Sequence, residues 1–478
     1  MKAENIQKRF ISLNPATNEV LWKGSAARKA DIDKAVKAAR KAYESWSLLS
    51  VDERLKFLDE FARLLNEQRN NFAATISQET GKPLWESFTE VNTMINKVKI
   101  SYDAYQDRCR EVSAPMDNAQ RATRFKPHGV VAVLGPFNLP GHLPNGHIVP
   151  ALLAGNTVVF KPSELTPLVG EKLVKVFEAA DLPSGVLNLV QGQKETGIAL
   201  SQHPGINGVF FTGSVEAGKV IHKFYAGKPE KILVLEMGGN NPLIFNDVQD
   251  ITAAVYLTIQ SAFVTSGQRC TCARRLIVVD GSSTDKFIAQ LVDATKKIQV
   301  GAYTNRPEPF IGPVISQRAG QGLLAAQDEL RKKGGKSLVA MSAVNNKAML
   351  KPGIMDTTKV KNRPDKEIFG PFLQLIRVKN FDEAVKEANN TVFGLAAGLL
   401  CNDECLYKKF LARSRSGVVS WNRPTTGASS QAPFGGVGQS GNYNPSAYFA
   451  ADYCAYPVAS IETNQLKLPE KLLPGITL

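Results

Sequence analysis

The sequence contains few cysteines and no long apolar segment. Its six cysteines in 478 residues are too sparse for a disulfide framework, which favours a reducing compartment. No run of about 18 apolar residues occurs, and the segment from Met1 to Lys8 lacks the apolar core of a signal peptide. We therefore expect a cytoplasmic protein that does not enter a membrane.

The sequence also lacks the usual motifs of nucleic-acid and metal binding. Its formal net charge of +14 attracts anions. However, the basic residues are dispersed, and no zinc-finger, RNA-recognition or basic-zipper pattern is found. Cys270 and Cys272 are spaced C-x-C, but no second pair of cysteines or histidines with zinc-ligand spacing lies nearby. We expect neither a nucleic-acid partner nor a metal site.

Apolar residues are abundant enough to build large buried cores. They make up 43% of the 478 residues, and this length suggests two or three domains. Before residue 100, apolar positions recur at helical spacing, and Ser50 with Glu53 forms a capping box that opens one helix. From about residue 121, strands alternate with helices, a pattern typical of parallel sheets in α/β proteins.

This alternation occurs in two successive series, which predict two α/β units. In the first series we expect strands at 130–134, 157–160, 186–190, 209–211 and 232–235 and helices at about 165–180 and 215–225. In the second we expect strands near 275–279, 372–378 and 417–421 and helices near 283–298, 316–333 and 381–389. The segment 432–441 is rich in glycine and proline and is predicted to be a loop.

Cys270 is the candidate nucleophile. Asp250 is a suitable N-cap for a helix whose apolar positions recur until Gly267, and residues 275–280 have the pattern of a buried strand. Cys270 is therefore predicted on a turn anchored on both sides. Because a free cysteine is most often a small buried hydrophobic residue, a catalytic role needs support from neighbouring groups.

Two other segments supply such groups. Glu236 follows the apolar strand 232–235 and precedes two glycines, and partial desolvation there suits it to accept a proton from a thiol or a water molecule. Asn138 lies on a turn after the strand 130–134 and offers an amide donor to a carbonyl oxygen. A nucleophile, a base and an oxyanion donor are the parts that covalent chemistry at a carbonyl requires.

Six short motifs together resemble those of the aldehyde dehydrogenase superfamily and stand in the same order. They are Gly-Pro-Phe-Asn at 135–138, Lys-Pro-Ser-Glu at 161–164, Phe-Thr-Gly-Ser at 211–214, Leu-Glu-Met-Gly-Gly at 235–239, Gly-Gln-Arg-Cys at 267–270 and Glu-Ile-Phe-Gly-Pro at 367–371. The resemblance implies an α/β fold with a Rossmann-type NAD domain, an α/β catalytic domain and a small oligomerisation element.

The same resemblance implies boundaries for these parts. The NAD-binding domain would comprise 1–108 and 129–238, and the catalytic domain 239–438. A hairpin at 109–128 and a tail at 439–478 would pair between the subunits of a homodimer or a dimer of dimers.

The segment 210–218 is the candidate phosphate site of the cofactor. It has the pattern of a strand, a glycine turn and the start of a helix, which presents N–H groups and the positive helix end to a phosphate. The predicted contacts are Gly213, Ser214, Val215, Glu216, Ala217 and Gly218. The spacing is not G-x-G-x-x-G, and taken alone the segment also fits a simple strand-to-helix turn.

Resemblance assigns four further cofactor residues. Lys161 and Glu164 would bind the adenosine ribose, whereas Glu367 would hold the nicotinamide ribose and Phe369 would flank the ring. A carboxylate at Glu164 accepts hydrogen bonds from ribose hydroxyls but repels a 2′-phosphate, so we expect NAD rather than NADP.

The leading hypothesis is NAD-dependent oxidation of an aldehyde to a carboxylate through a thiohemiacetal and a thioester on Cys270. Asn138 and the Cys270 N–H would bind the oxyanion, and Glu236 would activate water. The alternatives are another semialdehyde dehydrogenase of the same superfamily, a thiol hydrolase, a dehydrogenase that passes the acyl group to coenzyme A or phosphate, and a binding protein without activity. A hydrolase would need one of the five histidines as its base, at 128, 142, 147, 203 or 222.

The substrate is expected to be a small anionic aldehyde. The segments 140–147 and 269–275 most resemble members of the superfamily that act on a semialdehyde with two carboxylates, which requires cationic or strong neutral donors. Candidate donors are Arg423, His142 and Arg269. Arg423 is favoured because it follows a strand in a loop, where binding residues concentrate. Arg269 has a second interpretation, since an arginine beside a catalytic cysteine can support the loop instead.

Overall fold

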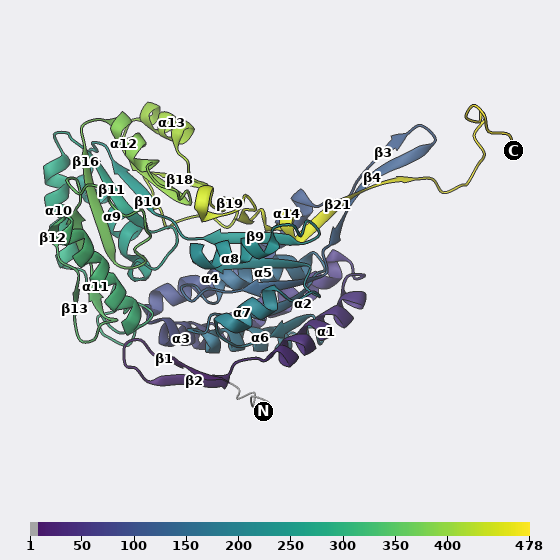
Figure 1. Cartoon of the computed structure of the whole chain (residues 1–478), viewed down its shortest axis with the longest axis horizontal. Coiled ribbons are helices and arrows are strands. Elements are labelled where there is room, and N and C mark those ends of the chain that lie inside the picture. The colour runs from purple at the N-terminus through teal and green to yellow at the C-terminus, as the bar shows by residue number, and fades with distance from the viewer. Residues whose placement is uncertain (1–7) are drawn as a thin grey trace.

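The structure is a computed structural model and describes residues 8–478. Two predictions, the lack of a signal peptide and the start of the first domain at residue 1, fall on residues outside that range. Two large sheets with helices on their faces form the body of the molecule, and a narrow three-stranded sheet projects from it (Figure 1). Within the described range, no helix combines the length and the apolar character needed to cross a membrane.

The first sheet has five parallel strands in the order β7-β6-β5-β8-β9. They are β5 (Val130–Leu134), β6 (Thr157–Lys161), β7 (Leu187–Leu189), β8 (Gly208–Gly213) and β9 (Ile232–Met237). β5 is buried along its whole length, and its sequence is a continuous apolar run because helices cover both faces of the sheet.

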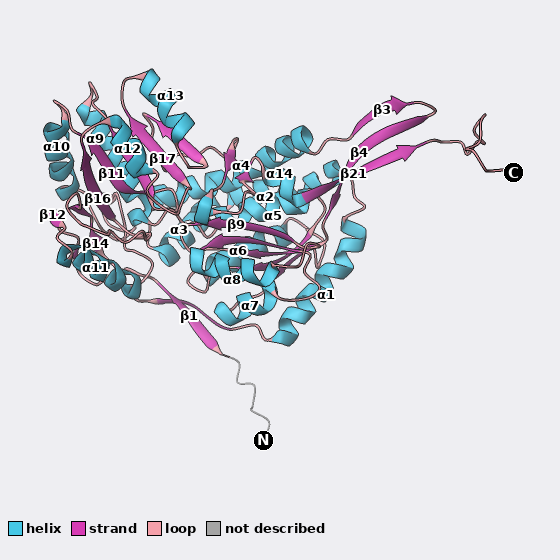
Figure 2. Ribbon diagram, turned by 45° about the horizontal axis from the view of Figure 1, so that its top comes forward, coloured by secondary structure: helices cyan, strands magenta, loops and turns pink. Residues whose placement is uncertain are grey.

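Helices pack on both faces of this sheet (Figure 2). One face carries α2 (Val51–Glu67), α3 (Arg69–Thr80), α4 (Leu84–Arg108), α5 (His142–Leu153) and α6 (Pro167–Ala179). The other carries α1 (Lys29–Trp46), α7 (Lys194–Ser201) and α8 (Val215–Tyr225). Val131 and Val133 join the first core, and Val130 and Ala132 join the second, as the two-residue period of a strand requires.

The second sheet has seven strands in the order β12-β15-β16-β11-β10-β17-β18, parallel except for β12. They are β10 (Asn241–Phe245), β11 (Ala273–Val279), β12 (Lys336–Val339), β15 (Gly353–Asp356), β16 (Phe372–Val378), β17 (Ala396–Leu400) and β18 (Val418–Trp421). α9 (Ile251–Phe263) and α10 (Thr284–Lys296) pack on one face, and α12 (Phe381–Ala388) and α13 (Glu404–Arg413) on the other. α11 (Gln317–Lys332) packs at the end near β15.

The projecting sheet has the strand order β21-β4-β3 and ends near the carboxyl terminus (Figure 1). β3 (Val112–Met116) and β4 (Ala119–Pro127) form a hairpin, and β21 (Ala455–Glu462) pairs with β4 along its whole length within the chain. α14 (Ala450–Cys454) joins β21 to the body. Pairing between subunits and the division into domains remain predictions.

Short strand pairs complete the fold. They are β1 (Arg9–Leu13) with β2 (Val20–Ser25), β13 (Ser342–Ala343) with β14 (Leu350–Lys351), and β19 (Pro433–Phe434) with β20 (Ser446–Ala447).

The strands and helices predicted for both series are present, but four strands of the second sheet, β10, β12, β15 and β17, were not predicted. β10 contains Pro242, which argues against a strand, yet a register shift beside Pro242 accommodates it and pairing with β17 begins only at Leu243. β17 consists of alanine, glycine and leucine, which are weak strand formers, and complete burial between β10 and β18 outweighs that propensity.

Candidate active site

The turn that carries Cys270 has an unusual backbone. α9 begins at Asp250, whose side chain accepts from the Ala253 N–H at 2.9 Å, but it ends at Phe263 rather than at Gly267. A 3₁₀ turn follows, in which Thr265 and Ser266 have φ values of 56° and 53°. Such angles are costly for residues with a Cβ and persist only where the surroundings enforce them.

Buried side chains enforce this turn. The guanidinium of Arg274, which is fully buried, donates to the carbonyls of Gly267 at 2.5 Å and Arg269 at 2.9 Å. The side chain of Asn241 donates to the Cys270 carbonyl at 2.6 Å. Side chains from strands β10 and β11 therefore hold the turn that carries Cys270. The same contacts explain why β11 begins at Ala273, two residues before the predicted strand.

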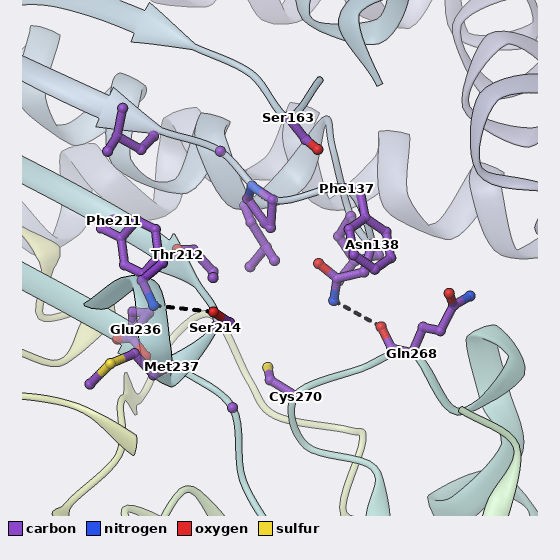
Figure 3. Close-up of a pocket in the computed structure, with 18 of the residues that line it drawn as sticks. Phe137, Asn138, Ser163, Phe211, Thr212, Ser214, Glu236, Met237, Gln268 and Cys270 are labelled. Atoms are coloured by element: carbon purple, nitrogen blue, oxygen red, sulfur yellow. Dashed lines mark hydrogen bonds between the residues drawn. The ribbon is translucent and has the colours of Figure 1, made fainter. Parts of the chain in front are cut away.

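The Cys270 sulfur points into a cavity of about 1240 Å³ (Figure 3). The side chain of Asn138 lies on one side of it, and those of Ser214, Glu236 and Met237 lie on the other. Burial, together with the carboxyl groups of Glu367 and Glu236, raises the pKa of the Cys270 thiol to about 12. The thiol therefore keeps its proton at neutral pH until a base removes it.

Glu236 is the predicted base, and it is one of the two carboxyl groups close enough to raise the pKa of the thiol. It lies at the end of β9, is 5% exposed and lines the same cavity. One of its oxygens accepts from the Ser446 N–H at 3.3 Å, and the other has no hydrogen-bond partner among the described residues. Burial raises the pKa of Glu236 to about 8, which suits a group that must both accept and release a proton near neutral pH.

The two predicted oxyanion donors are the Asn138 amide and the Cys270 backbone N–H. Asn138 is buried and lines the cavity, and its Nδ2 donates to the Gln268 carbonyl at 2.9 Å, which fixes the orientation of the amide (Figure 3). The backbone N–H of Cys270 has no acceptor within residues 8–478. A buried N–H without an acceptor is rare in folded proteins and is suited to a ligand oxygen.

No histidine is placed to serve Cys270 as a base. Of the five, His142 and His147 line the cavity. Both ring nitrogens of His147 are engaged, with Tyr453 Oη at 2.8 Å and Thr212 Oγ1 at 3.1 Å. Within the described residues no histidine bonds to the Cys270 sulfur, so the arrangement lacks the histidine base that a thiol hydrolase needs.

At the other end of the cavity, α8 begins directly after β8. Ser214 caps the helix by accepting from the Ala217 N–H at 3.2 Å (Figure 3). Of the six residues predicted to contact the phosphate, four line the cavity, namely Gly213, Ser214, Glu216 and Ala217. Val215 is instead buried in the core, and Gly218 lets α8 approach β9, since a Cβ there would collide with Met237.

The four cofactor residues assigned by resemblance also line this cavity. Lys161 is buried, donates to the Pro162 carbonyl at 2.6 Å and lies 3.9 Å from the Glu164 carboxylate. Glu367 lies 3.3 Å from Arg274 and packs against Gly238, where a Cβ would collide with its carboxylate. Phe369 meets Phe137 edge to face at a centroid distance of 6.0 Å.

The predicted substrate donors have different environments. His142 lines the cavity, and its Nδ1 is inaccessible and without a partner among the described residues. Arg269 also lines the cavity, but it donates to Glu86 at 2.8 Å and to Thr265 at 2.7 Å, which matches the loop-supporting interpretation. Arg423 is exposed and is not among the residues that line the cavity.

Residues of α4 near the nucleophile were not predicted. Glu86, Glu90 and Lys97 are buried, and Glu90 and Lys97 line the cavity. A signal was present in the sequence, because Glu90, Met94 and Lys97 recur at helical spacing on the buried face of α4. A charged residue on such a face needs a partner.

Comparison with known proteins agrees with this geometry. The chain matches the model of the aldehyde dehydrogenase family over residues 1–456. It is similar to the N-succinylglutamate 5-semialdehyde dehydrogenase of Pseudomonas fluorescens, with 55% identity over 468 residues that cover 98% of this chain and 96% of the relative.

Two solved structures share the fold. One is a glyceraldehyde-3-phosphate dehydrogenase from Methanocaldococcus jannaschii complexed with NADP, with 29% identity, a TM-score of 0.89 and coverage of 96% of this chain and 99% of that one. The other is a betaine aldehyde dehydrogenase from Staphylococcus aureus in complex with NAD⁺, with 27% identity, a TM-score of 0.89 and coverage of 98% and 94%. Because the family match and the 55% identical relative both span nearly the whole chain, this protein belongs to the aldehyde dehydrogenase family and is an oxidoreductase that acts on aldehydes.

Proposed function

We propose that this enzyme oxidises N-succinylglutamate 5-semialdehyde to N-succinylglutamate and uses NAD as the hydride acceptor. The observation that carries the chemistry is the meeting of the Cys270 thiol, the Glu236 carboxyl group and two oxyanion donors at one cavity. The substrate is supported by the name of the relative that is 55% identical.

In the first step the Cys270 sulfur bonds to the aldehyde carbon, and the thiol proton passes to Glu236. The carbonyl oxygen becomes an oxyanion that the Asn138 amide and the Cys270 N–H stabilise. NAD, when bound, accepts the hydride that leaves this carbon. A thioester on Cys270 remains.

The second step releases the acid. Glu236, after losing its proton, accepts one from a water molecule, and the resulting hydroxide adds to the thioester carbon. The bond from carbon to Cys270 Sγ then breaks, Glu236 returns its proton to the sulfur, and the carboxylic acid leaves. The buried position of Glu236 beside the cavity favours water over coenzyme A as the acyl acceptor.

The residues at the cofactor end fit a dinucleotide. The amino end of α8 offers free N–H groups and the positive end of the helix dipole, which suit a pyrophosphate. Glu164 is half exposed beside Lys161, where it would accept hydrogen bonds from ribose hydroxyls. The carboxylate would repel a 2′-phosphate, which supports NAD over NADP. Glu367 is free to approach a ribose because Gly238 lacks a side chain.

The test is formation of NADH from the purified enzyme with the semialdehyde, followed by product analysis. We expect free N-succinylglutamate without an added acyl acceptor, and a higher kcat/KM with NAD than with NADP. Cys270→Ala should abolish NADH formation while NAD still binds in a titration of protein fluorescence. Turnover by that variant, or a strict requirement for coenzyme A, would contradict the proposed chemistry.

A further inference from the structure

Lys97 is a buried cation at the wall of the catalytic cavity. It lies in α4 between the buried residues Met94 and Val98, is 1% exposed and lines the cavity. Its ammonium group donates to the Ala447 carbonyl at 2.8 Å. No carboxylate lies within ion-pair distance of it in the described part of the chain. An ammonium group in such a place is costly unless an anion joins it.

The neighbouring charges already have partners. The Arg269 guanidinium lies 2.8 Å from Glu86, and Lys82 forms an ion pair with Glu90. Lys97 is therefore the one cation of this cluster, defined as Lys82, Lys97, Arg269, Glu86 and Glu90, that is unbalanced within residues 8–478. Burial lowers the pKa of Lys97 to about 8, so the group still carries its charge at neutral pH.

Lys97 lies on the same side of the cavity as the catalytic base. The ammonium group of Lys97 contacts Ala447, and the Glu236 carboxyl group contacts Ser446, the preceding residue of β20. His142 is a second polar group near Lys97. Burial and the charge of Lys97 lower the pKa of His142 to about 3, which makes the ring neutral and leaves it one N–H to donate.

We propose that Lys97, with the neutral His142 ring as a second donor, binds one carboxylate of the substrate and makes the enzyme selective for anionic aldehydes. The inference rests on the proposed function and assigns to Lys97 the role that the sequence suggested for Arg423. A carboxylate there would give the ammonium group its missing partner, through a charge-assisted hydrogen bond in a site largely shielded from water.

A purely structural role for Lys97 has a different consequence. Ala447 has a φ of 61°, which is rare for a residue with a Cβ, and the bond from Lys97 helps to hold it. If Lys97 acted only through Ala447, and so through Glu236, its loss would slow the oxidation of charged and uncharged aldehydes by the same factor.

The experiment compares kcat/KM for N-succinylglutamate 5-semialdehyde and for pentanal, an uncharged aldehyde. Lys97→Gln keeps a donor for Ala447 but removes the charge. We expect it to lower kcat/KM for the dianionic substrate by about 30-fold or more, as for the loss of one partner of a buried charge pair, with pentanal little changed. Lys99→Gln is the matched control, because Lys99 lies on the same helix with its side chain 80% exposed.

Equal losses for both aldehydes, or an unchanged preference in Lys97→Gln, would overturn the assignment of Lys97 while the dehydrogenase function stands. A wild-type enzyme that prefers pentanal would instead reject the proposed substrate. Calorimetric titration with N-succinylglutamate separates binding from turnover, and the wild-type enzyme should bind it more tightly than Lys97→Gln does. If Lys97→Gln does not fold, His142→Phe is tested in the same way and should also lose selectivity for the anion.

Discussion

The acid–base groups around Cys270 derive their proton affinities from burial. The pKa of Glu236 is raised to about 8 and that of the Cys270 thiol to about 12, and the charge of Arg274, which lowers the pKa of the thiol, does not offset the effect of burial. Removing water disfavours the charged form of each group. At neutral pH the thiol and the larger fraction of Glu236 therefore hold their protons, which protects the thiol from reaction outside the catalytic cycle, and the ionised fraction of Glu236 is the form that takes the thiol proton.

The raised pKa of Glu236 predicts how turnover depends on pH. Water activation needs the Glu236 carboxylate, which is the minor form below pH 8 and the major form above it, so kcat should rise with pH through about 8 when hydrolysis limits turnover. In Glu236→Gln the rise should disappear, and NADH formation should be slow in the first turnover as well as in the steady state, because the thiol loses the base that takes its proton. Stopped-flow absorbance over a range of pH measures both.

The control for this experiment is Glu230→Gln, since Glu230 is exposed and is not among the residues that line the cavity. It should keep the wild-type profile. A Glu236→Gln enzyme with full steady-state turnover and the same pH profile would show that another group activates water.

The sequence indicated the candidate residues of the chemistry, which line one cavity in the structure, but it did not indicate which cations line that cavity. Cys270, Glu236 and Asn138 lie on turns or strand ends marked by glycine and proline, and local pattern identifies such places. No local pattern shows whether Arg423 or Lys97 meets the cavity. Which face of a helix or loop meets the cavity depends on packing between α4, α5 and β20, and the linear sequence does not contain that information.

At the scale of elements, the nucleophile turn depends on the strand that follows it. Thr265, Ser266 and Gly267 all have positive φ values, and all three are buried. The Ser266 hydroxyl donates to the Gly312 carbonyl at 2.7 Å, and Arg274 of β11 binds the two carbonyls on either side of Gln268. The strained backbone is thus held by side chains from elements outside the turn.

Arg274→Met should therefore affect catalysis as well as stability. The Gly267 carbonyl would be left buried without a partner, at roughly 1–3 kcal/mol, and the Arg269 carbonyl would keep only the Cys272 N–H. Displacement of Cys270 should lower kcat by about 100-fold. Arg274→Lys keeps the charge beside Glu367, but an ammonium group lacks the forked guanidinium donors that bind two carbonyls at once. Its kcat and stability should therefore lie between those of the wild-type enzyme and of Arg274→Met. Thermal unfolding and steady-state kinetics measure these effects.

Arg275→Met is the matched comparison. Arg275 is also buried, but it donates to the carbonyls of Asn240, Glu387 and Ala388 rather than to the nucleophile turn. It should lower the melting temperature with a smaller loss of kcat. Equal losses of kcat in the two variants would indicate general destabilisation rather than displacement of the turn.

The elements themselves were predicted where the sequence pattern and the burial agreed. β5 and the segment 276–279 of β11 are apolar runs that are buried, and α8 begins and ends at the predicted residues. β10 and β17 were missed because their propensities are poor and their stability comes from neighbouring strands, which are distant in the sequence. Contacts between segments that are far apart along the chain thus determine that β10 and β17 form strands.

On the scale of the whole molecule, segments distant in sequence close the cavity. The cofactor end comes from the first sheet and the nucleophile from the second, and the segment after β19 packs on the edge strand β9. The Asn442 side chain accepts from the Leu235 N–H at 2.9 Å and donates to the Leu233 carbonyl at 2.8 Å. Thus the segment before β21 orders the strand that carries Glu236.

The projecting sheet supports our proposal that the enzyme forms a homodimer or a dimer of dimers. Its outer strands, β3 and β21, have no further partner strand in the described range, and Val112, Met116, Tyr456 and Ile461 on them are 43–70% exposed. An exposed strand edge with apolar side chains is a ready surface for pairing with another chain. In a free monomer the edges of β3 and β21 and the apolar side chains on them would be exposed to water.

Ile461→Glu should therefore weaken self-association. Ile461 is 70% exposed on β21, and a carboxylate there would be buried without a partner if the strand packs against another subunit. Light scattering coupled to size exclusion should show a smaller species for Ile461→Glu than for the wild-type enzyme at equal concentration. Leu411→Glu serves as the control, because Leu411 is an exposed apolar residue on α13, away from this sheet. If Ile461→Glu and Leu411→Glu elute with the wild-type mass, the projecting sheet is not the interface, and the proposed role of β21 in assembly is wrong.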